Sequence, residues 1–281
     1  MSHIKYPLNI VNISVVALLL MTIMSWSSIL SDNYGGILDI LKSESRANLW
    51  SFAQQLAGTN LDREHALFNL EYWQSALYFS LETIRMSVLA IGIAGIFALM
   101  TFLHGSRNIV NGELPSFNRT YRLILFRVIR TLFIITRGTP ELLIAMLLIF
   151  VLSPGILPGA IALAIHNYGI LGKLSSELVE NLDQSPIEAL KANGSNNYQI
   201  LFYGIFPQVL PQFLTYLTYR WEVITRTTIV VGLVSAGGLG REFMIRMSWF
   251  QYDRVLVLLI CYISLVILID LISIQLRKLI T

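Results

Sequence analysis

Long apolar segments separated by short polar ones dominate the chain. Stretches of about 20 mostly apolar residues are long enough to cross a bilayer as a helix. Six such stretches occur, at roughly 8–30, 73–103, 121–152, 154–175, 199–234 and 255–276. This pattern predicts an all-α membrane protein with about six transmembrane helices.

The composition agrees with that prediction. Hydrophobic residues make up 55% of the 281 and charged residues 13%, and the mean hydropathy is +0.64. These values lie outside the usual range of soluble domains. Lys5 precedes the first apolar stretch as in a signal peptide, but the stretch is long and no clean cleavage site follows before Ser31, so we expect a retained helix.

Charged residues indicate how the helices are oriented. Basic residues cluster around the second loop and at the end of the chain: Arg107, Arg119, Arg122, Arg127, Arg130, Arg277 and Lys278. Since basic loops stay in the cytoplasm, we expect both termini and the loops near residues 110 and 185 there. The first loop, roughly 31–72, has six acidic residues against three basic ones and is expected outside.

Two parts of the chain are expected from this layout. Residues 1–70 would form the first transmembrane helix and the external loop, and 71–281 the core of the bundle. Within the loop, Leu49, Phe52 and Leu56 recur at helical spacing. They predict an amphipathic helix that lies on the outer interface or packs against the bundle.

A short polar stretch, SPIEALKANG at 185–194, has the pattern of a helix with defined ends. Ser185 is a natural N-cap, Pro186 suits the first helical position, and Glu188 would complete a capping box. Gly194 would supply a left-handed stop. A helix of two turns is not stable alone, so it is either a connector resting on its own bundle or a docking element, for which the small Ala189 and Ala192 allow close approach.

The same stretch resembles the EAA loop carried by membrane subunits of ATP-binding-cassette importers. That motif is E-A-A-x3-G followed by x9-I-x-L-P, and Glu188, Ala189, Gly194 and Pro207 fall at its positions. Leu190 replaces the third motif residue, and Gly204 and Phe206 stand where Ile and Leu are usual.

Four longer segments narrow the resemblance to the membrane subunits of phosphonate and phosphite importers. They are RGTPELL (137–143), LAIHNYGILGKLSSELVEN (163–181), YRWEVITRTTIVVGLVSAGGLG (219–240) and QYDRV (251–255). The likeness runs from about residue 70 to the end. Arg85 departs from it, since a neutral polar residue is expected there.

The resemblance implies a type I importer bundle, working as two copies in a bacterial-type cytoplasmic membrane. A coupling helix near 186–193 would seat in a cytoplasmic dimer of ATP-binding subunits, and an external binding protein would deliver a phosphorus oxyanion. The implied coupling residues are Ser185, Pro186, Glu188, Ala189, Lys191, Ala192 and Gly194.

ATP and Mg²⁺ are expected in the partner ATPase, and no cofactor or metal in this chain. The sequence contains no G-x4-G-K-[ST] phosphate loop, and neither a nucleophile with an adjacent base nor metal-ligand spacing is found. We therefore expect a transport subunit that is not itself an enzyme and has no nucleic-acid partner.

Charged and polar residues inside the apolar stretches are candidates for the translocation pathway or a gate, because they usually face protein or water. The set is Arg137, Glu141, His166, Asn167, Arg220, Glu222, Arg226, Gly237 and Gly238. Glu222 and Arg226 have the spacing of a helical ion pair. The alternative is structural: the charges lock helices together, His166 bonds a neighbouring helix, and the glycines form a turn or a close helix contact.

Two other functions stay open at this point. RGTPELL is also similar to importers of polar amino acids, and an ion-coupled secondary transporter or a membrane-embedded enzyme would be a different class. The absence of a visible internal repeat disfavours a secondary transporter.

Overall fold

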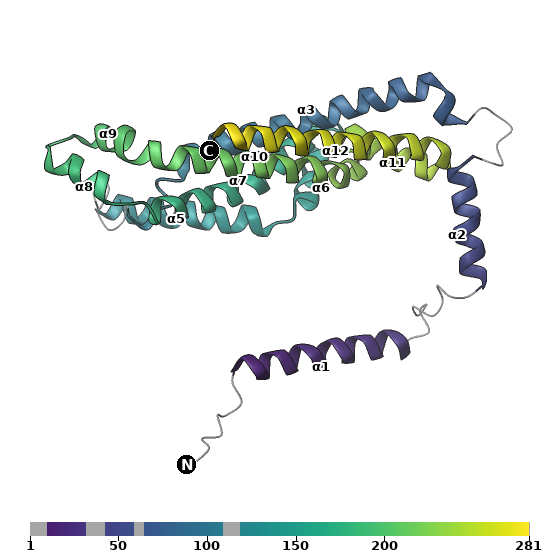
Figure 1. The fold of residues 1–281 in the computed structure, drawn as a ribbon, viewed down its shortest axis with the longest axis horizontal. Helices are drawn as coiled ribbons and strands as arrows, with labels where there is room; N and C mark the ends of the chain where they lie inside the picture. The colour runs from purple at the N-terminus through teal and green to yellow at the C-terminus, as the bar shows by residue number, and fades with distance from the viewer. Residues whose placement is uncertain (1–9, 32–42, 59–64, 109–118, 281) are drawn as a thin grey trace, which may run out of the picture. The chain divides into compact units, whose positions relative to one another are not determined.

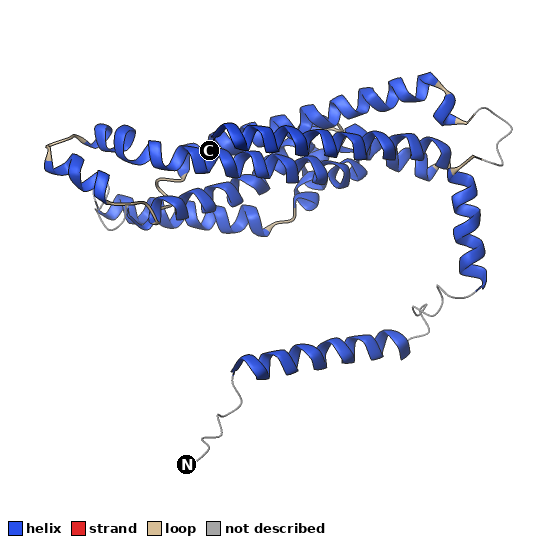
Figure 2. Cartoon of the chain, viewed as in Figure 1, coloured by secondary structure: helices blue, strands red, loops and turns tan. Residues whose placement is uncertain are grey.

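The computed structural model describes residues 10–31, 43–58, 65–108 and 119–280 (Figure 1). Across these ranges the structure consists of helices and connecting turns, with no strand (Figure 2). The chain divides into two compact units, Met1–Asp62 and Arg63–Thr281. The predicted all-α class is confirmed.

The first unit contains two described helices, α1 (Ile10–Ser31) and α2 (Ser43–Leu56). α1 is apolar on all sides, as a helix surrounded by lipid would be. α2 is the helix that Leu49, Phe52 and Leu56 predict, and it exposes Trp50. Its place at the outer interface stays a prediction, and parts of the predicted external loop lie outside the described residues.

The second unit is a helical bundle. Its long helices are α3 (Leu70–Thr101), α5 (Arg119–Gly138), α6 (Glu141–Leu152), α7 (Ile156–Glu180), α10 (Phe206–Val231), α11 (Gly238–Ser248) and α12 (Tyr252–Ile280). α7 packs against α3, α5, α6 and α10. Small residues of α3, such as Ala90, Ala94 and Ala98, are fully buried and permit this close approach. The short helix α8 (Ser185–Ala192) lies at one end of the bundle and α11 towards the other (Figure 1).

Four described helical segments are long and apolar enough to cross a membrane: Val11–Ile29, Leu70–Thr101, Asn197–Val234 and Tyr252–Ile280. The expected span at 121–152 is two helices, α5 and α6, which meet at 92° and would make a fifth crossing if taken together. Pro140 explains the break, because it has no N–H and disfavours the helical conformation of Thr139. α7 covers the remaining expected span but is not among these segments. It carries the polar residues His166 and Asn167 near its middle.

Close packing of α7 on α5 depends on glycine. A Cβ at Gly169 would lie 2.8 Å from the Phe133 carbonyl oxygen and 2.8 Å from the Arg137 nitrogen, both backbone atoms. We expect Gly169→Ala to destabilise the fold by about 1–3 kcal/mol through overpacking. Gly92→Ala is the matched control, because no atom lies within 4 Å of that Cβ position. Thermal unfolding of the purified protein should show a lower Tm for the first variant only; equal Tm values would contradict the packing.

Candidate functional site

The start of α8 is stabilised by Asp183 and not by the predicted capping box. Ser185 is the first helical residue, and its N–H and hydroxyl donate to Asp183 Oδ1 at 3.0 and 2.7 Å. The predictions of Ser185 as N-cap and of Glu188 as its reciprocal partner are wrong, because the Asp183 carboxylate is a stronger acceptor nearby. Both hydrogen bonds lower the pKa of Asp183. Their stabilising effect is present at neutral pH and is lost as pH falls through that lowered pKa.

The end of α8 confirms the predicted left-handed stop. Gly194 has a φ of +76°. Its N–H donates to the Lys191 carbonyl, and the Ser195 N–H donates to the Leu190 carbonyl, both at 3.0 Å. This is the hydrogen-bond pattern of a Schellman motif, so the chain leaves the helix at a fixed angle.

The segment after α8 also has a defined start. Asn196 and Gln199 form a capping box, with hydrogen bonds of 2.9 and 2.8 Å, at the beginning of α9 (Asn197–Gln199). The helix continues through the π-helical segment η3 (Ile200–Ile205) into α10. α8 is therefore joined to α10 by a short connection with ordered ends.

One face of α8 is held by its own chain. Ile187 is fully buried and Leu190 is half-buried against the core. A Cβ at Gly204 of η3 would lie 3.2 Å from Leu190 Cδ1 and 3.4 Å from Ile187 Cγ1. Gly204, which departs from the usual motif, thus makes room for these two side chains. The residues on the other face, Pro186, Glu188, Ala189, Lys191 and Ala192, are exposed.

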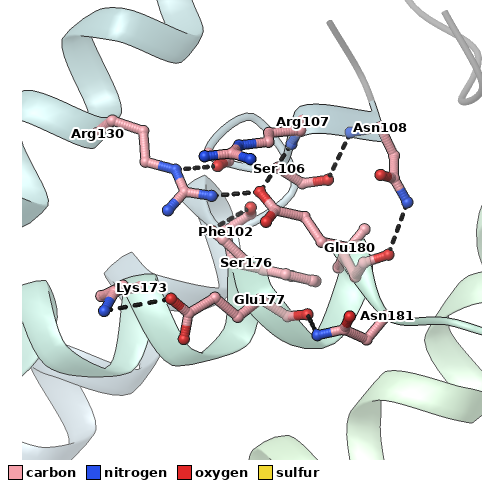
Figure 3. Close-up of polar contacts among 12 residues, drawn as sticks. Phe102, Ser106, Arg107, Asn108, Arg130, Lys173, Ser176, Glu177, Glu180 and Asn181 are labelled. Atoms are coloured by element: carbon pink, nitrogen blue, oxygen red, sulfur yellow. Dashed lines mark hydrogen bonds and ion pairs between the residues drawn. The ribbon is translucent and has the colours of Figure 1, made fainter. Parts of the chain in front are cut away.

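A group of polar contacts joins the turn after α3, the middle of α5 and the end of α7 (Figure 3). Glu180, the last residue of α7, forms an ion pair with Arg130 of α5 and accepts a 2.9 Å hydrogen bond from the Arg107 N–H. Arg130 Nε donates to the Gly105 carbonyl at 2.7 Å, and Asn108 donates to the Val179 carbonyl at 2.9 Å. These contacts, here called the α7-end clamp, tie the turn after α3 to α5 and α7.

A polar cluster lies at the break between α5 and α6. His166 Nδ1 donates to the Thr139 carbonyl at 3.0 Å, and His166 Nε2 lies 3.5 Å from Glu141 Oε2. The neighbouring Asn167 accepts a 2.8 Å hydrogen bond from Arg220 Nε. Four of the predicted residues, from α6, α7 and α10, therefore come together.

The cluster combines the guanidinium of Arg220 with the imidazole of His166 and the carboxyl group of Glu141. A carbonyl oxygen only accepts, so Nδ1 of His166 carries hydrogen. Arg220 has the planar fork that binds oxyanions, and in this conformation Asn167 Oδ1 occupies it. Arg137, the half-buried residue before the break, has no ion pair among the described contacts.

A second group of charges links α10 to α12. The predicted pair of Glu222 and Arg226 is present. Arg226 also lies 3.1 Å from Asp270, and Arg277 lies 3.4 Å from Glu222. These four residues are here called the α10–α12 network. Asp270 was missed by the sequence analysis, although it is the only acidic residue in the last apolar stretch.

A double-mutant cycle tests this network. Glu222→Gln and Arg226→Gln should each slow uptake, because each leaves a net charge among the remaining three residues. The double variant is neutral and should lose less than the sum, with a coupling of about 0.5–3 kcal/mol. Recovery stays incomplete, since Asp270 and Arg277 each lose a partner. Strictly additive effects on the uptake rate would exclude the coupling.

Gly237 and Gly238 form a closely packed turn between η4 (Gly232–Ala236) and α11. Their φ values are +89° and +67°. The Gly238 N–H donates to Glu82 at 3.2 Å, and a Cβ on Gly238 would lie 2.7 Å from Thr83 Oγ1 of α3. The turn is thus packed on α3, while a role as a gating hinge stays a prediction.

The apolar bundle, its capped helix with one exposed face and its internal polar clusters have the architecture of a membrane transport subunit. The model of one family, described as binding-protein-dependent transport system inner membrane component, matches residues 117–280. Because this match covers more than half of the chain, the protein belongs to that family.

Individual relatives agree with the resemblance seen in the sequence. The chain is 35% identical over 198 residues to the phosphite transport system permease protein PtxC of Stutzerimonas stutzeri, covering 70% of this chain and 68% of that protein. It is 29% identical over 199 residues to the phosphate-import permease protein PhnE of Mycolicibacterium smegmatis, covering 71% and 36%. The predicted relationship to phosphite and phosphonate permeases is confirmed.

Solved structures support the fold. A chain of an amino acid ABC transporter crystallised with histidines matches with a TM-score of 0.60 and 18% identity, covering 77% of this chain and 99% of that one. The MetNI methionine ABC transporter gives a TM-score of 0.54 and 17% identity, covering 73% and 97%. These likenesses show the fold of the bundle; the family match, together with the long apolar helices, makes the chain a multi-pass inner membrane protein.

Proposed function

We propose that the chain is the permease subunit of an ATP-driven importer that carries a phosphorus oxyanion, phosphonate or phosphite, across the cytoplasmic membrane. The observation that carries this proposal is the 35% identity, over 70% of the chain, to a protein named as a phosphite transport permease. A binding protein outside the membrane would select the substrate, and two copies of this chain would form the pathway. Both termini would lie in the cytoplasm.

The geometry of α8 supports a coupling role. Its inner face is fixed by Ile187 and its C-terminal angle by Gly194, while Glu188, Ala189 and Lys191 are exposed. A cytoplasmic dimer of ATP-binding subunits, which would bind ATP and Mg²⁺, could seat this face in a cleft. When the two ATPases close, α8 would move as a rigid lever. ATP binding would open the bundle outwards, and hydrolysis would return it.

The polar cluster at the α5–α6 break is the proposed point at which the substrate passes. Arg220 would attract an oxyanion, and Asn167, whose side-chain oxygen accepts a hydrogen bond from it here, would have to give way to the substrate. Arg137 is close in sequence to the same break and would add positive potential. The α10–α12 network contributes little to this attraction, because its two cations face two anions.

ATP hydrolysis in lipid tests the proposal. The chain would be co-expressed with the ATPase and the binding protein encoded beside it, and challenged with phosphite, methylphosphonate, phosphate and a panel of amino acids. Stimulation by one phosphorus oxyanion is the expected result. Arg220→Gln should abolish this stimulation, whereas Arg85→Gln, which removes an exposed cation of α3 outside the cluster, should preserve it. Stimulation by an amino acid alone, or no associated ATPase, would refute the proposal.

A further inference from the structure

A polar pocket lies between α3, α11 and α12, at the end of the bundle away from α8 (Figure 1). Its empty space is about 230 Å³, part of which is open to the surroundings. The polar residues that line it are Tyr72, Ser75, Glu242, Arg246 and Arg254, all within the second unit. The pocket shares no residue with the polar cluster at the α5–α6 break.

Two arginines of this pocket share one neutral acceptor. Arg246 Nη1 and Arg254 Nη1 donate to the same oxygen, Gln251 Oε1, at 2.8 and 2.9 Å. Arg246 also pairs with Glu242, whose Oε1 accepts from Nε at 2.6 Å. Among the described residues, Arg254 has no carboxylate within ion-pair distance, and its buried Nε has no hydrogen-bond partner. The lining therefore contains two positive charges and one negative charge.

The surroundings of Arg254 do not supply the missing negative charge. Arg254 is the third residue of α12, where the N–H groups of the first turn add positive potential. The preceding Asp253 is buried but does not line the pocket, and the segment 238–254 contains three arginines and two acidic residues. The guanidinium of Arg254 lies over the Tyr72 ring, 4.4 Å from its centroid, and donates to the Tyr72 hydroxyl at 2.6 Å. These contacts fix the plane of the guanidinium but leave its charge.

Two guanidinium groups that converge on one oxygen have the geometry of an oxyanion site. Each presents a planar fork of donors, and the Tyr72 hydroxyl, which accepts from Arg254, keeps its own hydrogen for donation. The side-chain amide of Gln251 offers these donors a single oxygen. An oxyanion in its place would offer several oxygens and a negative charge.

The turn between α11 and α12 indicates the depth of the pocket in the membrane. Trp249 and Phe250 are 72% and 76% exposed there, and tryptophan is enriched where the membrane meets water. With α8 in the cytoplasm, this end of the bundle is the outer one. Both a free anion from outside and the phosphate of a lipid headgroup could reach the pocket at this depth.

We propose that this pocket, here called the outer arginine pocket, binds a phosphorus oxyanion, either the substrate before it reaches the α5–α6 break or a lipid headgroup. The choice of phosphorus and of the outer side rests on the proposed function. Gln251 would turn away and release the forks of Arg246 and Arg254, while Glu242 would keep its pair with Arg246.

Protection of a cysteine from labelling tests the pocket. The complex of the permease with its ATPase, in nanodiscs and without the binding protein, would carry Cys261→Ala to remove the single cysteine. Ser75→Cys then places a thiol in the lining, and Gln74→Cys places one on an exposed position of α3 outside it. We expect phosphite to slow maleimide labelling of Ser75→Cys, compared with potassium chloride at equal ionic strength, and to leave Gln74→Cys unchanged.

Two substitutions of Gln251 should act in opposite directions. Gln251→Glu keeps the size of the side chain but puts a carboxylate between the guanidiniums, so the phosphite concentration for half protection should rise at least roughly tenfold, the equivalent of one charge-assisted hydrogen bond. Gln251→Ala frees both forks and should lower that concentration about threefold. Arg241→Gln removes an exposed cation of α11 outside the lining and should change nothing. The same half-protection concentration in all of these variants would overturn the inference.

The lipid identifies the source of the oxyanion. Protection by phosphite in nanodiscs of phosphatidylglycerol and of a phosphate-free galactolipid assigns the pocket to a free oxyanion. Labelling of Ser75→Cys that is slow only in phosphatidylglycerol, and that phosphite does not change, assigns it to a headgroup. Rapid labelling in both lipids, unaffected by phosphite, would show that the pocket binds neither.

Protection is measured without ATP hydrolysis, so the two proposals can fail separately. If phosphite protects Ser75→Cys but does not stimulate hydrolysis, the outer arginine pocket stands and the proposed substrate fails. If phosphite stimulates hydrolysis but labelling is rapid in both lipids, the transport function stands and this pocket fails.

Discussion

Gly194→Val is expected to uncouple ATP hydrolysis from uptake while leaving the chain folded and inserted. The residue has a φ of +76°, and no atom lies within 4 Å of the position that a Cβ would occupy. The effect therefore arises from the backbone alone and not from a clash. A left-handed conformation costs an ordinary residue about 1–2 kcal/mol and is least accessible to β-branched ones. Relief of that strain would break the Schellman motif and change the angle at which α8 meets η3.

The measurement is substrate transported per ATP hydrolysed in proteoliposomes. If the strain destabilises the correctly seated conformation of α8 by about 1.4 kcal/mol, this ratio should fall roughly tenfold. Gly194→Asn is the matched control, because Asn tolerates the left-handed region and should retain most coupling. Normal transport and normal stimulated hydrolysis in Gly194→Val would show that the exit angle of α8 is not used.

The features of α8 that the sequence predicted are those fixed by a single residue. Gly194 marked the stop because few residues other than glycine adopt its conformation readily. The N-terminal cap was misassigned because Asp183 and Ser185 are both good acceptors, and sequence spacing cannot decide which of them the chain places against the free N–H groups. Which face of α8 is buried depends on its packing against η3. The sequence did not predict this packing, because neither the π-helical turn nor Gly204 produces a periodic pattern of apolar residues.

Inside the bundle, a contact between two side chains could be predicted only when the two residues are close in sequence. Glu222 and Arg226 are four residues apart on one helix, so their contact was predicted and is observed. Asp270 is 44 residues from Arg226, and Glu180 is 50 residues from Arg130. Such pairs require the packing of whole helices and cannot be read from local pattern. The apolar composition of α5 and α6 likewise concealed a 92° bend, although Pro140 was visible.

The second large effect is expected from a substitution in the α7-end clamp. Arg130→Leu is expected to reduce both coupling and stability, because it removes the ion pair with Glu180 and the donor to the Gly105 carbonyl. The two side chains are only 22% and 18% exposed. Loss of one partner from a buried pair costs about 3–5 kcal/mol; partial exposure reduces this, so we expect about 2 kcal/mol in unfolding free energy and a lower Tm.

A charge exchange distinguishes the clamp from a simple attraction. Arg130→Glu with Glu180→Arg restores opposite charges, but glutamate cannot donate to the Gly105 carbonyl and arginine cannot accept from the Arg107 N–H. Uptake should therefore recover by less than half. Glu177→Gln is the control, because its i,i+4 pair with Lys173 is more exposed and is worth about 0.2–0.5 kcal/mol. If Arg130→Leu proved as mild as Glu177→Gln in both uptake and Tm, the clamp would not be what holds the turn after α3 against α5 and α7.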